Sequence, residues 1–323
     1  HHIPALNRDP RAAVAVVVDA DPVRRTLVTD TFHLPTADDF HDAISTQHLD
    51  GLLIATPHSA HAPLAVAALR AGIPVLVEKP LTLSSGDAQI LADLVDRTGV
   101  PLMVGYTAQF TEAARLACEW VQHEIGALHQ VIVEFSSRAG ARYSQTDPAD
   151  ASSAYSAANG SGQATTQLSH AFGAITSATD RAFTEVAAFT ANRGAAVDID
   201  DVVAFRLEGG ATGTAASTGT LPAGLPMRHQ VRYIGAEGIV EHDLLWSTAR
   251  MDGLDGRIRA HRPTHIEPPY AAAAPVTAFL SLLEGAGGNP APVRPAAAAV
   301  AAIEALLRSA HTGRAEPVPT ITH

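Results

Sequence analysis

The first third of the sequence alternates short apolar runs with helical patterns, and this alternation restricts the fold more than any other feature. The apolar runs are rich in Val, Ile and Leu, as in strands buried on both faces, and lie at 12–20, 51–57, 73–80 and 100–106. Helical patterns separate them at 21–30, 59–72 and 83–99. Repeated strand–helix units of this length predict a doubly wound parallel sheet, the Rossmann arrangement, with helices on both faces.

From about residue 128 the pattern changes to strands joined by short turns. These runs lie at 129–138, 183–191, 200–210, 211–221, 228–243 and 246–254. Helical patterns are expected at 162–179, 272–285 and 295–311. We therefore predict an α+β second domain with a large, mostly antiparallel sheet. The domains are predicted as 1–107 and 108–323, with the C-terminal helices packing back on the first domain.

The amino-acid composition excludes several classes of function for this protein. Hydrophobic residues make up 46% and the net charge is −11, which fits a globular protein and disfavours nucleic acid as a partner. The single cysteine, Cys118, excludes an internal disulfide and a multi-cysteine zinc site, and no metal site is predicted. The apolar runs are too short to cross a membrane, and the given sequence leads us to expect no secretory signal. We expect a cytoplasmic protein without a membrane partner.

Asp19 follows the first apolar run and precedes a helix. In a dinucleotide-binding fold an acid at this place bonds the adenosine ribose and disfavours a 2′-phosphate, so NAD is predicted over NADP. The alternative is a surface or capping residue. A glycine-rich phosphate loop belongs about 20 residues earlier, but residues 1–19 contain no glycine. We expect that the chain is a fragment lacking its first strand and this loop; the alternative is that pyrophosphate binding has been lost.

The segment "ATPHSAH" follows the second apolar run. The carboxyl ends of parallel strands face the ligand crevice, so Thr56 and Pro57 are expected to line the cofactor. His58 and His61 are candidates for polar contacts there. The alternative for each histidine is a structural role at the start of a helix.

The third apolar run ends in "VLVEKP". The stretch "IATPHSAHAPLAVAALRAGIPVLVEKPLTLS" resembles the Gfo/Idh/MocA family of nicotinamide-dependent oxidoreductases in the order and spacing of its motifs. "LMVGYTAQF" is similar to the segment that leaves the first domain in that family. The resemblance spans essentially the whole chain after its start.

The resemblance implies roles for the residues of "EKP". Lys79 would lie near the nicotinamide and bond the reacting hydroxyl, where an ammonium can stabilise an alkoxide or pass a proton. Glu78 would orient the cofactor site, and the peptide bond before Pro80 is often cis in the family. The alternative is an exposed strand end with a turn proline.

A second motif lies in "NGSGQATTQLSHAFG". The family usually places an Asp four residues before a His on one helix face. His170 matches this histidine and is a candidate general base; the alternative is a buried structural histidine. Thr166 stands where the Asp is expected, and Gln167 lies near the same face, so both are predicted to bind substrate. A branch of the family has a similar "GGGQ…TQ…H" pattern.

Three further positions complete the predicted site. Gln109 is expected to contact the cofactor, and Tyr106 is expected to shape the substrate cleft. Tyr155 lies with Arg142 in a long polar loop, 138–162, which could cover the substrate.

These features predict an NAD-dependent dehydrogenase that acts on a hydroxyl carbon of a sugar, cyclitol or related polyol. Two alternatives stay open: an NAD-using, glycoside-cleaving relative, and a non-catalytic nucleotide-sensing regulator of the same fold. The family resemblance also implies a homodimer or homotetramer.

Overall fold

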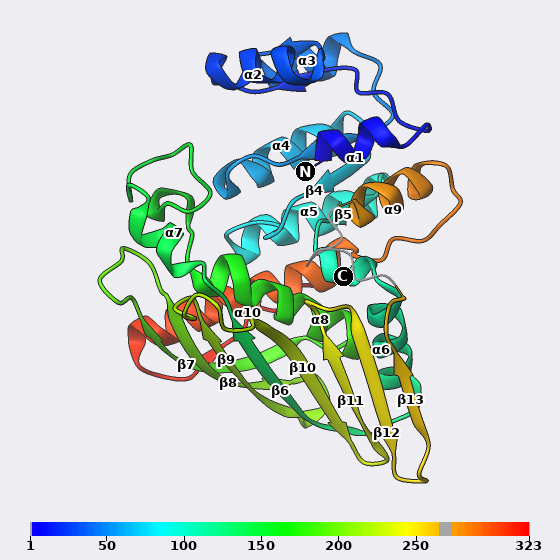
Figure 1. The fold of residues 1–323 in the computed structure, drawn as a ribbon, viewed down its shortest axis with the longest axis vertical. Coiled ribbons are helices and arrows are strands. Elements are labelled where there is room, and N and C mark those ends of the chain that lie inside the picture. The colour runs from blue at the N-terminus through cyan, green and yellow to red at the C-terminus, as the bar shows by residue number, and fades with distance from the viewer. Residues whose placement is uncertain (1, 265–272, 323) are drawn as a thin grey trace.

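The computed structural model describes residues 2–264 and 273–322. The first part of the chain forms two small parallel sheets (Figure 1). One sheet pairs β1 (Val17–Val18) with β2 (Thr36–Ala37), and the other contains β3 (Leu52–Ile54), β4 (Val75–Val77) and β5 (Leu102–Val104). The buried strand β4 lies between β3 and β5, which confirms the predicted parallel arrangement.

Helices of this part connect the strands. They are α1 (His2–Arg8), α2 (Pro22–Phe32), α3 (Phe40–Thr46), α4 (His61–Arg70) and α5 (Ser85–Thr98), with short 3₁₀ turns at His58–Ala60 and Thr107–Phe110. Asp21 caps α2 by accepting a hydrogen bond from the Val23 amide. The sequence patterns did not indicate β2 and α3.

The strand predicted at 12–20 is much shorter in the structure. Only Val17 and Val18 pair, and they pair with β2 alone. A strand persists only as far as its ladder of hydrogen bonds, so the apolar residues before Val17 form no strand. That a further strand belongs beside this pair stays a prediction.

The second part is built on a nine-stranded sheet in the described residues, with the order β13-β12-β11-β10-β6-β9-β8-β7-β14. Its strands are β6 (Leu128–Ser136), β7 (Phe183–Ala191), β8 (Asp200–Leu207), β9 (Thr212–Thr218), β10 (Arg228–Gly235), β11 (Gly238–Asp243), β12 (Thr248–Gly253), β13 (Ile258–His261) and β14 (Glu316–Pro317). The pair β6–β9 is parallel and the other pairs are antiparallel. This confirms the predicted α+β domain.

One face of the large sheet is covered by helices, and the other face is open (Figure 1). The covering helices are α6 (Glu112–His123), α8 (Ser169–Thr179) and α10 (Val293–Thr312). Exposed and buried residues alternate along β8, β9 and β10, as expected for strands with one solvent face. The site described below lies on the covered face.

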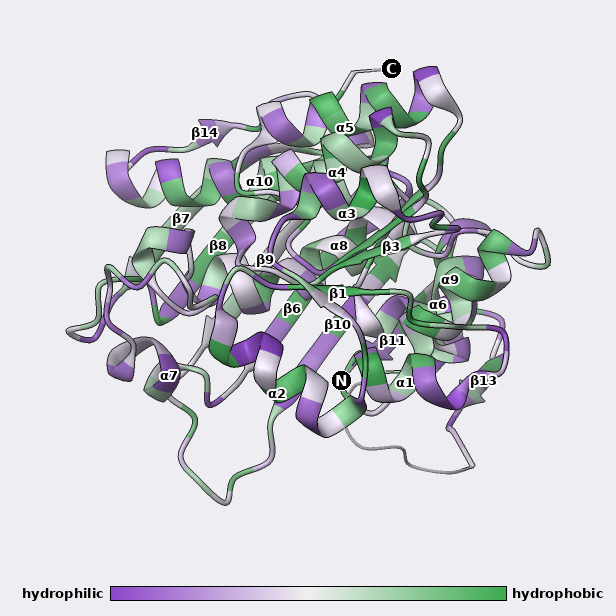
Figure 2. Ribbon diagram, turned by 90° about the horizontal axis from the view of Figure 1, so that it is seen from above, coloured by the Kyte–Doolittle hydropathy of each residue, from purple (hydrophilic) through white to green (hydrophobic). Residues whose placement is uncertain are grey.

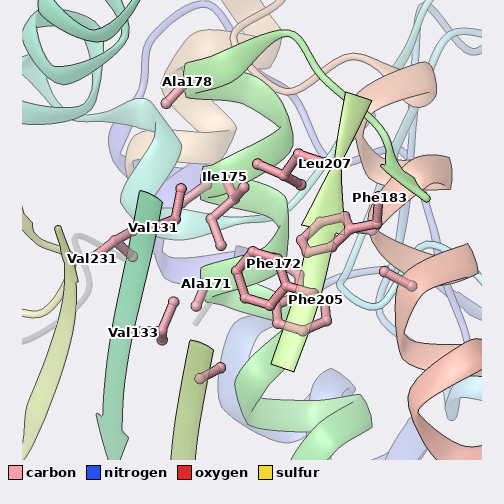
Figure 3. Packing of buried hydrophobic residues seen from close by; sticks show 14 of the residues in the cluster. Val131, Val133, Ala171, Phe172, Ile175, Ala178, Phe183, Phe205, Leu207 and Val231 are labelled. Atoms are coloured by element: carbon pink, nitrogen blue, oxygen red, sulfur yellow. The ribbon is translucent and has the colours of Figure 1, made fainter. Parts of the chain in front are cut away.

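Helix α8 is packed tightly against this sheet (Figure 3). Phe172 stacks on Phe183 with ring centroids 4.7 Å apart, and both rings contact Phe205 edge-on. Gly213 on β9 leaves room for the ring of Phe205, because a Cβ there would lie 2.2 Å from its Cζ. Truncating a ring in such a cluster costs about 3–5 kcal/mol, so α8 is a rigid support for the residues at its start.

The last two helices contact the first part of the chain. Helix α9 (Ala274–Leu283) contributes Phe279 to a cluster with Leu76 of β4 and Met103 of β5. Helix α10 is mostly apolar, with polar residues mainly in its C-terminal half (Figure 2), and its Val300 packs with the core around β4. Residue 272, where the predicted helix 272–285 begins, lies outside the described residues.

Among the described residues, no helix combines the length and the hydropathy that a membrane span requires.

Candidate active site

The site is organised around the residues that follow β4. The chain leaves the strand at Glu78, and the peptide bond between Lys79 and Pro80 is cis. Lys79 is the only lysine in the sequence, and arginine is used at all other positions that carry a permanent positive charge. Its flexible ammonium lies at the carboxyl end of a central parallel strand. Ligands bind at this end of such sheets.

The ammonium of Lys79 reaches across to the second domain. Its Nζ donates a hydrogen bond to the backbone carbonyl of Thr166 at 2.8 Å. Burial, the largest effect, lowers the pKa of Lys79, and the carboxylate of Glu78 opposes this shift. The pKa of Lys79 therefore lies closer to neutral pH than that of a solvated lysine, as is typical of lysines that transfer protons.

Glu78 is fixed by partners on both sides. Its Oε1 accepts a hydrogen bond from His2 Nε2 at 2.7 Å, and its Oε2 accepts one from the Lys79 amide. Burial would raise the pKa of Glu78, but the hydrogen bond from His2 and the charges of His2 and Lys79 outweigh it, so the pKa is lowered. The carboxylate stays ionised beside Lys79.

Thr166 lies in a π-helical turn, Ala164–Leu168, that runs directly into α8. Such π turns are frequent at functional sites. Two positions of this continuous helix are relevant: the Thr166 carbonyl holds Lys79, and His170 stands at the first turn of α8. The structure thus brings the two predicted catalytic residues to the same helix start.

His170 is buried between aromatic rings. Its ring is stacked parallel to Phe135, with centroids 6.4 Å apart, and edge-on to Tyr106 at 6.0 Å. Burial first, and then the charges of Lys79 and His229, lower the pKa of His170 well below its usual value. A neutral imidazole results, and a neutral imidazole can accept a proton.

The hydroxyl of Thr166, predicted to bind substrate, is already engaged inside the protein. It donates to the carbonyl of Gly162 at 2.7 Å, and it contacts the hydroxyl of Tyr143 in a short hydrogen bond. Tyr143 belongs to helix α7 (Gly140–Gln145) within the long loop. Gln167, which follows Thr166, lies near the same tyrosine hydroxyl.

Two residues of the site were not predicted from the sequence. Tyr143 bonds Thr166, and His229 of β10 stacks on Phe135 with centroids 3.7 Å apart. Burial lowers the pKa of His229 to about 4, so this imidazole is also neutral at pH 7. Neither residue belongs to a spacing motif; the only signal for Tyr143 was its place in a loop too long to be a plain connection.

The remaining predicted substrate residues lie around this core. Tyr155 stacks obliquely on Tyr143 at 5.8 Å, and its hydroxyl accepts a hydrogen bond from Arg142 at 2.6 Å. The side chain of Tyr106 is 1% exposed and packs against His170 and Gly173. The loop therefore folds onto the π-helical turn instead of standing free.

Gln109 lies at the edge of this core, beside Tyr106. Its amide lies against Gly173, and it forms part of the wall of a small cavity with Cys118 and His242. That wall includes none of the other predicted site residues. Its contact with the cofactor stays a prediction.

The turn after β3 carries two buried polar atoms without a partner among the described residues: Thr56 Oγ1 and His58 Nδ1. Burial first, and then the charge of Lys79, lower the pKa of His58 to about 3. An unsatisfied buried hydrogen-bonding atom is costly unless a ligand completes it. These atoms, beside Pro57 and close to Lys79, fit a polar cofactor at the carboxyl end of β3.

His61 has a different environment. Its Nδ1 lies 2.8 Å from the carbonyl oxygen of Pro80, and its Nε2 lies 3.0 Å from that of Thr56. Burial lowers the pKa of His61, so the neutral ring donates a hydrogen bond to one of these carbonyls and lies close to the other. The ring thus lies between the turn after β3 and the turn after β4. This geometry is compatible with the structural alternative, and a direct contact of His61 with the cofactor stays a prediction.

Asp19 stands at the end of β1, as the cofactor prediction requires. Its Oδ1 accepts a hydrogen bond from the Asp21 amide at 2.9 Å, and Arg24 Nη1 lies 3.9 Å from its Oδ2. The carboxylate is partly exposed, so it can accept ribose hydroxyls, and a cation stands beside it.

A cavity of about 500 Å³ lies on the side of the π-helical turn that faces α10. It borders Pro80 and Tyr106, and Thr165 and Ser169 form part of its wall. A volume of this size suits a small molecule.

Comparison with known proteins gives the family. Residues 1–106 match the model described as "Oxidoreductase family, NAD-binding Rossmann fold", and residues 115–241 match the model described as "GFO/IDH/MocA C-terminal domain". D-xylose 1-dehydrogenase (NADP(+)) 2 of Haloferax volcanii is 34% identical over 137 residues, 42% of this chain and 42% of that protein. Inositol 2-dehydrogenase of Corynebacterium glutamicum is 33% identical over 114 residues, 34% of this chain and 33% of that protein.

These matched segments span less than half the length of the curated relatives. A solved structure is similar over nearly the whole chain. GenD2 from gentamicin A biosynthesis, in complex with NAD, is 26% identical with a TM-score of 0.77, covering 99% of this chain and 93% of that chain. On the evidence of both family models and this shared architecture, the chain belongs to the GFO/IDH/MocA oxidoreductase family.

Proposed function

We propose that the protein is an NAD(P)-dependent oxidoreductase that transfers a hydride between a nicotinamide and a hydroxyl carbon of a sugar, cyclitol or related polyol. The observation that carries the proposal is the hydrogen bond from Lys79 Nζ to the Thr166 carbonyl, next to His170. It places an ammonium and a neutral imidazole at the carboxyl end of a parallel sheet. The xylose and inositol dehydrogenases named above support the substrate class.

The residues have separable roles in this reaction. When bound, the nicotinamide supplies the hydride acceptor or donor. Lys79 donates a hydrogen bond to the reacting oxygen and stabilises the negative charge that develops there. His170, kept neutral by burial, accepts the hydroxyl proton during oxidation and returns it during reduction. The Thr166 carbonyl fixes the direction of the ammonium.

We propose NAD as the preferred cofactor. The support is Asp19, whose carboxylate would bond the ribose hydroxyls and repel a 2′-phosphate. Thr56 and His58 would hold the part of the cofactor that lies nearer Lys79. The xylose dehydrogenase relative uses NADP(+), so the choice between the two cofactors needs its own measurement.

The experiment begins with titration of the protein with NADH, followed by its fluorescence. A panel of D-xylose, myo-inositol and related polyols is then tested with NAD and with NADP. Accumulation of reduced cofactor with one of them supports the proposal. Cleavage of a glycoside without accumulation of NADH assigns the glycoside-cleaving alternative, and binding without any turnover assigns the nucleotide-sensing one.

We also propose a cytoplasmic homodimer or homotetramer that pairs through the open face of the large sheet. Val202 on β8 is 59% exposed and Phe189 on β7 is 80% exposed, and the described helices cover only the opposite face (Figure 1). Apolar side chains exposed on a broad sheet are typical of subunit contacts. Light scattering after size-exclusion chromatography, with Val202→Glu as the disrupting variant, tests this assembly.

A further inference from the structure

Two carboxyl groups, one half-buried and one buried, lie beneath the π-helical turn that carries Thr166. Asp198 is in the loop between β7 and β8, and Asp201 is on β8 with its side chain toward the covered face. Asp201 is 1% exposed. Neither carboxyl is part of the hydride-transfer chemistry described above, and buried acids are rare unless they have a role.

Asp198 binds the beginning of the turn twice. Its Oδ2 accepts a hydrogen bond from the Ala164 amide at 2.6 Å, and its backbone carbonyl accepts one from the Gln163 amide at 3.0 Å. Amides at the start of a helix have no partner within the helix, and a carboxylate is the strongest acceptor that a side chain can offer them. Asp198 therefore fixes where the turn begins.

The backbone at Gly162 lies in close contact with the carboxylate of Asp198. A Cβ on Gly162 would lie 2.0 Å from Asp198 Oδ1, and the backbone there has φ +145°, a conformation that favours glycine. Gly162 also accepts the hydrogen bond of the Thr166 hydroxyl. The glycine and the acid thus fit together as one support for the turn.

The second acid, Asp201, interacts electrostatically with Asp198. Burial, and next the negative charge of Asp198, raise the pKa of Asp201, and burial also raises the pKa of Asp198. With a pKa of about 9, the Asp201 carboxyl is protonated at neutral pH, which removes one of the two negative charges. The other titratable groups that interact with the two acids are Tyr143 of α7 and Asp200, which pairs with Arg193.

The π-helical turn contacts Lys79 through the carbonyl of Thr166. Three residues after Gln163, the Thr166 carbonyl accepts the hydrogen bond of the Lys79 ammonium at 2.8 Å. A displacement of about 1 Å in a catalytic group can cost 10²-fold in rate. The bonds at the start of the turn and the bond at Thr166 are separated by less than one helical turn, so movement of one displaces the other.

We propose that Asp198, half-buried beside Asp201, is a positioning residue that fixes the Thr166 carbonyl and through it the catalytic ammonium of Lys79. The inference rests on the proposed function, because it takes Lys79 as the catalytic lysine. It extends that function by adding a support for Lys79 that comes from the far side of the π-helical turn.

The sole lysine of the chain makes a direct test possible. Protein grown with lysine labelled with ¹³C at Cε gives one lysine Cε resonance, that of Lys79, and its chemical shift against pH reports the protonation of the ammonium. The variants are Asp198→Ala, which removes the acceptor, and Asp198→Asn, which keeps one. Asp200→Asn, two residues further along the chain and without a hydrogen bond to the turn, is the matched control.

We expect Asp198→Ala to shift the Lys79 resonance and its titration midpoint. It should lower kcat by about tenfold or more, with the dissociation constant of NADH within about twofold of the original. Asp198→Asn should recover part of both changes, and Asp200→Asn should match the unaltered protein. An Asp198→Ala protein that folds with an unchanged Lys79 titration overturns the proposal; if it does not fold, an Asp198→Asn titration and kcat identical to the unaltered protein overturn it.

Failure of the proposed function gives a different result. If the unaltered protein turns over no polyol, the dehydrogenase assignment is lost, while the Lys79 resonance still decides whether Asp198 positions the ammonium. If turnover is present but Asp198→Ala leaves both the resonance and kcat unchanged, the dehydrogenase assignment stands and the positioning role is lost.

Discussion

Lys79 Nζ donates a 2.8 Å hydrogen bond to the backbone carbonyl of Thr166, and this bond joins the central parallel strand of the first domain to the π-helical turn of the second. The acceptor is a backbone atom, so the identity of residue 166 does not decide whether the bond forms. The family's usual Asp at this position is therefore not needed to hold the lysine. The Thr166 side chain instead secures its own turn through Gly162 and Tyr143.

Replacement of Lys79 by Met should abolish most of the turnover while leaving the cofactor site intact. We expect kcat to fall by about 10²–10⁴-fold, the usual contribution of a positioned proton-transfer group, because Met keeps the apolar stem but has no ammonium. Stopped-flow measurement of NADH formation gives kcat, and NADH fluorescence gives the dissociation constant.

The control for this variant is Arg70→Met, at the exposed end of α4. It removes one positive charge far from the turn and should change kcat by less than about twofold. Turnover by Lys79→Met at the original rate would show that the reacting oxygen is bound by another group.

Replacement of Asp19 by Ser should move the cofactor preference toward NADP. The carboxylate no longer repels a 2′-phosphate, and Arg24, whose Nη1 lies 3.9 Å from Asp19, becomes available to bind it. We expect the ratio of kcat/KM for NAD to that for NADP to fall by about tenfold or more, since each 1.4 kcal/mol is a factor of ten.

Asp30→Ser, an exposed acid on α2, is the matched control and should leave the ratio unchanged. An Asp19→Ser protein with the original ratio would place the ribose-binding group elsewhere.

Replacement of Gly162 by Ala should destabilise the protein by more than the backbone strain of a positive φ alone. The new Cβ would lie 2.0 Å from Asp198 Oδ1, so either the carboxylate or the turn must move. The free energy of unfolding should fall by several kcal/mol, as for forced overpacking combined with backbone strain.

Gly194→Ala separates the two effects. Gly194 also has a positive φ, +85°, but a Cβ there meets nothing within 4 Å. It should therefore lose only about 1–3 kcal/mol from backbone strain. Urea unfolding of both variants measures the difference, and equal losses would mean that the turn tolerates displacement of Asp198.

Several features of the fold and site could be predicted because they depend on local sequence. Runs such as 73–80 indicate strands buried on both faces, and the position of Lys79 after β4 follows from the order of strand and turn. The strand at 12–20 was overestimated because an apolar run forms a strand only where a neighbour pairs with it, and only Val17 and Val18 are paired.

Long-range contacts could not be predicted from spacing. The bond between Tyr143 and Thr166 and the stack of His229 on Phe135 join residues that are 23 and 94 positions apart, and only the folded sheet brings them together. The role of His61 was also ambiguous in the sequence. A histidine at a helix start can face a ligand or connect two turns, and spacing does not show that the Pro80 and Thr56 carbonyls lie beside the ring of His61.

Acidification should destabilise the protein through His242, a buried histidine of β11 that is 3% exposed. Burial lowers the pKa of His242 to about 4, whereas the unfolded chain binds its proton near the ordinary value of about 6.5. Between these values the unfolded state holds more protons than the folded state. The contribution of His242 to the free energy of unfolding is therefore fully present above about pH 6.5. It decreases as the pH falls toward 4, and below that pH this group causes no further loss.

For this one histidine the linkage gives a loss of about 2 kcal/mol between pH 7.5 and pH 5. His242→Leu removes the titrating group and keeps an apolar side chain, so the slope of unfolding free energy against pH should decrease by that amount. His129→Leu, at an exposed position of β6, is the matched control and should retain the original slope. Urea unfolding at several pH values measures both variants; an unchanged slope in His242→Leu would show that its imidazole titrates alike in the folded and unfolded states.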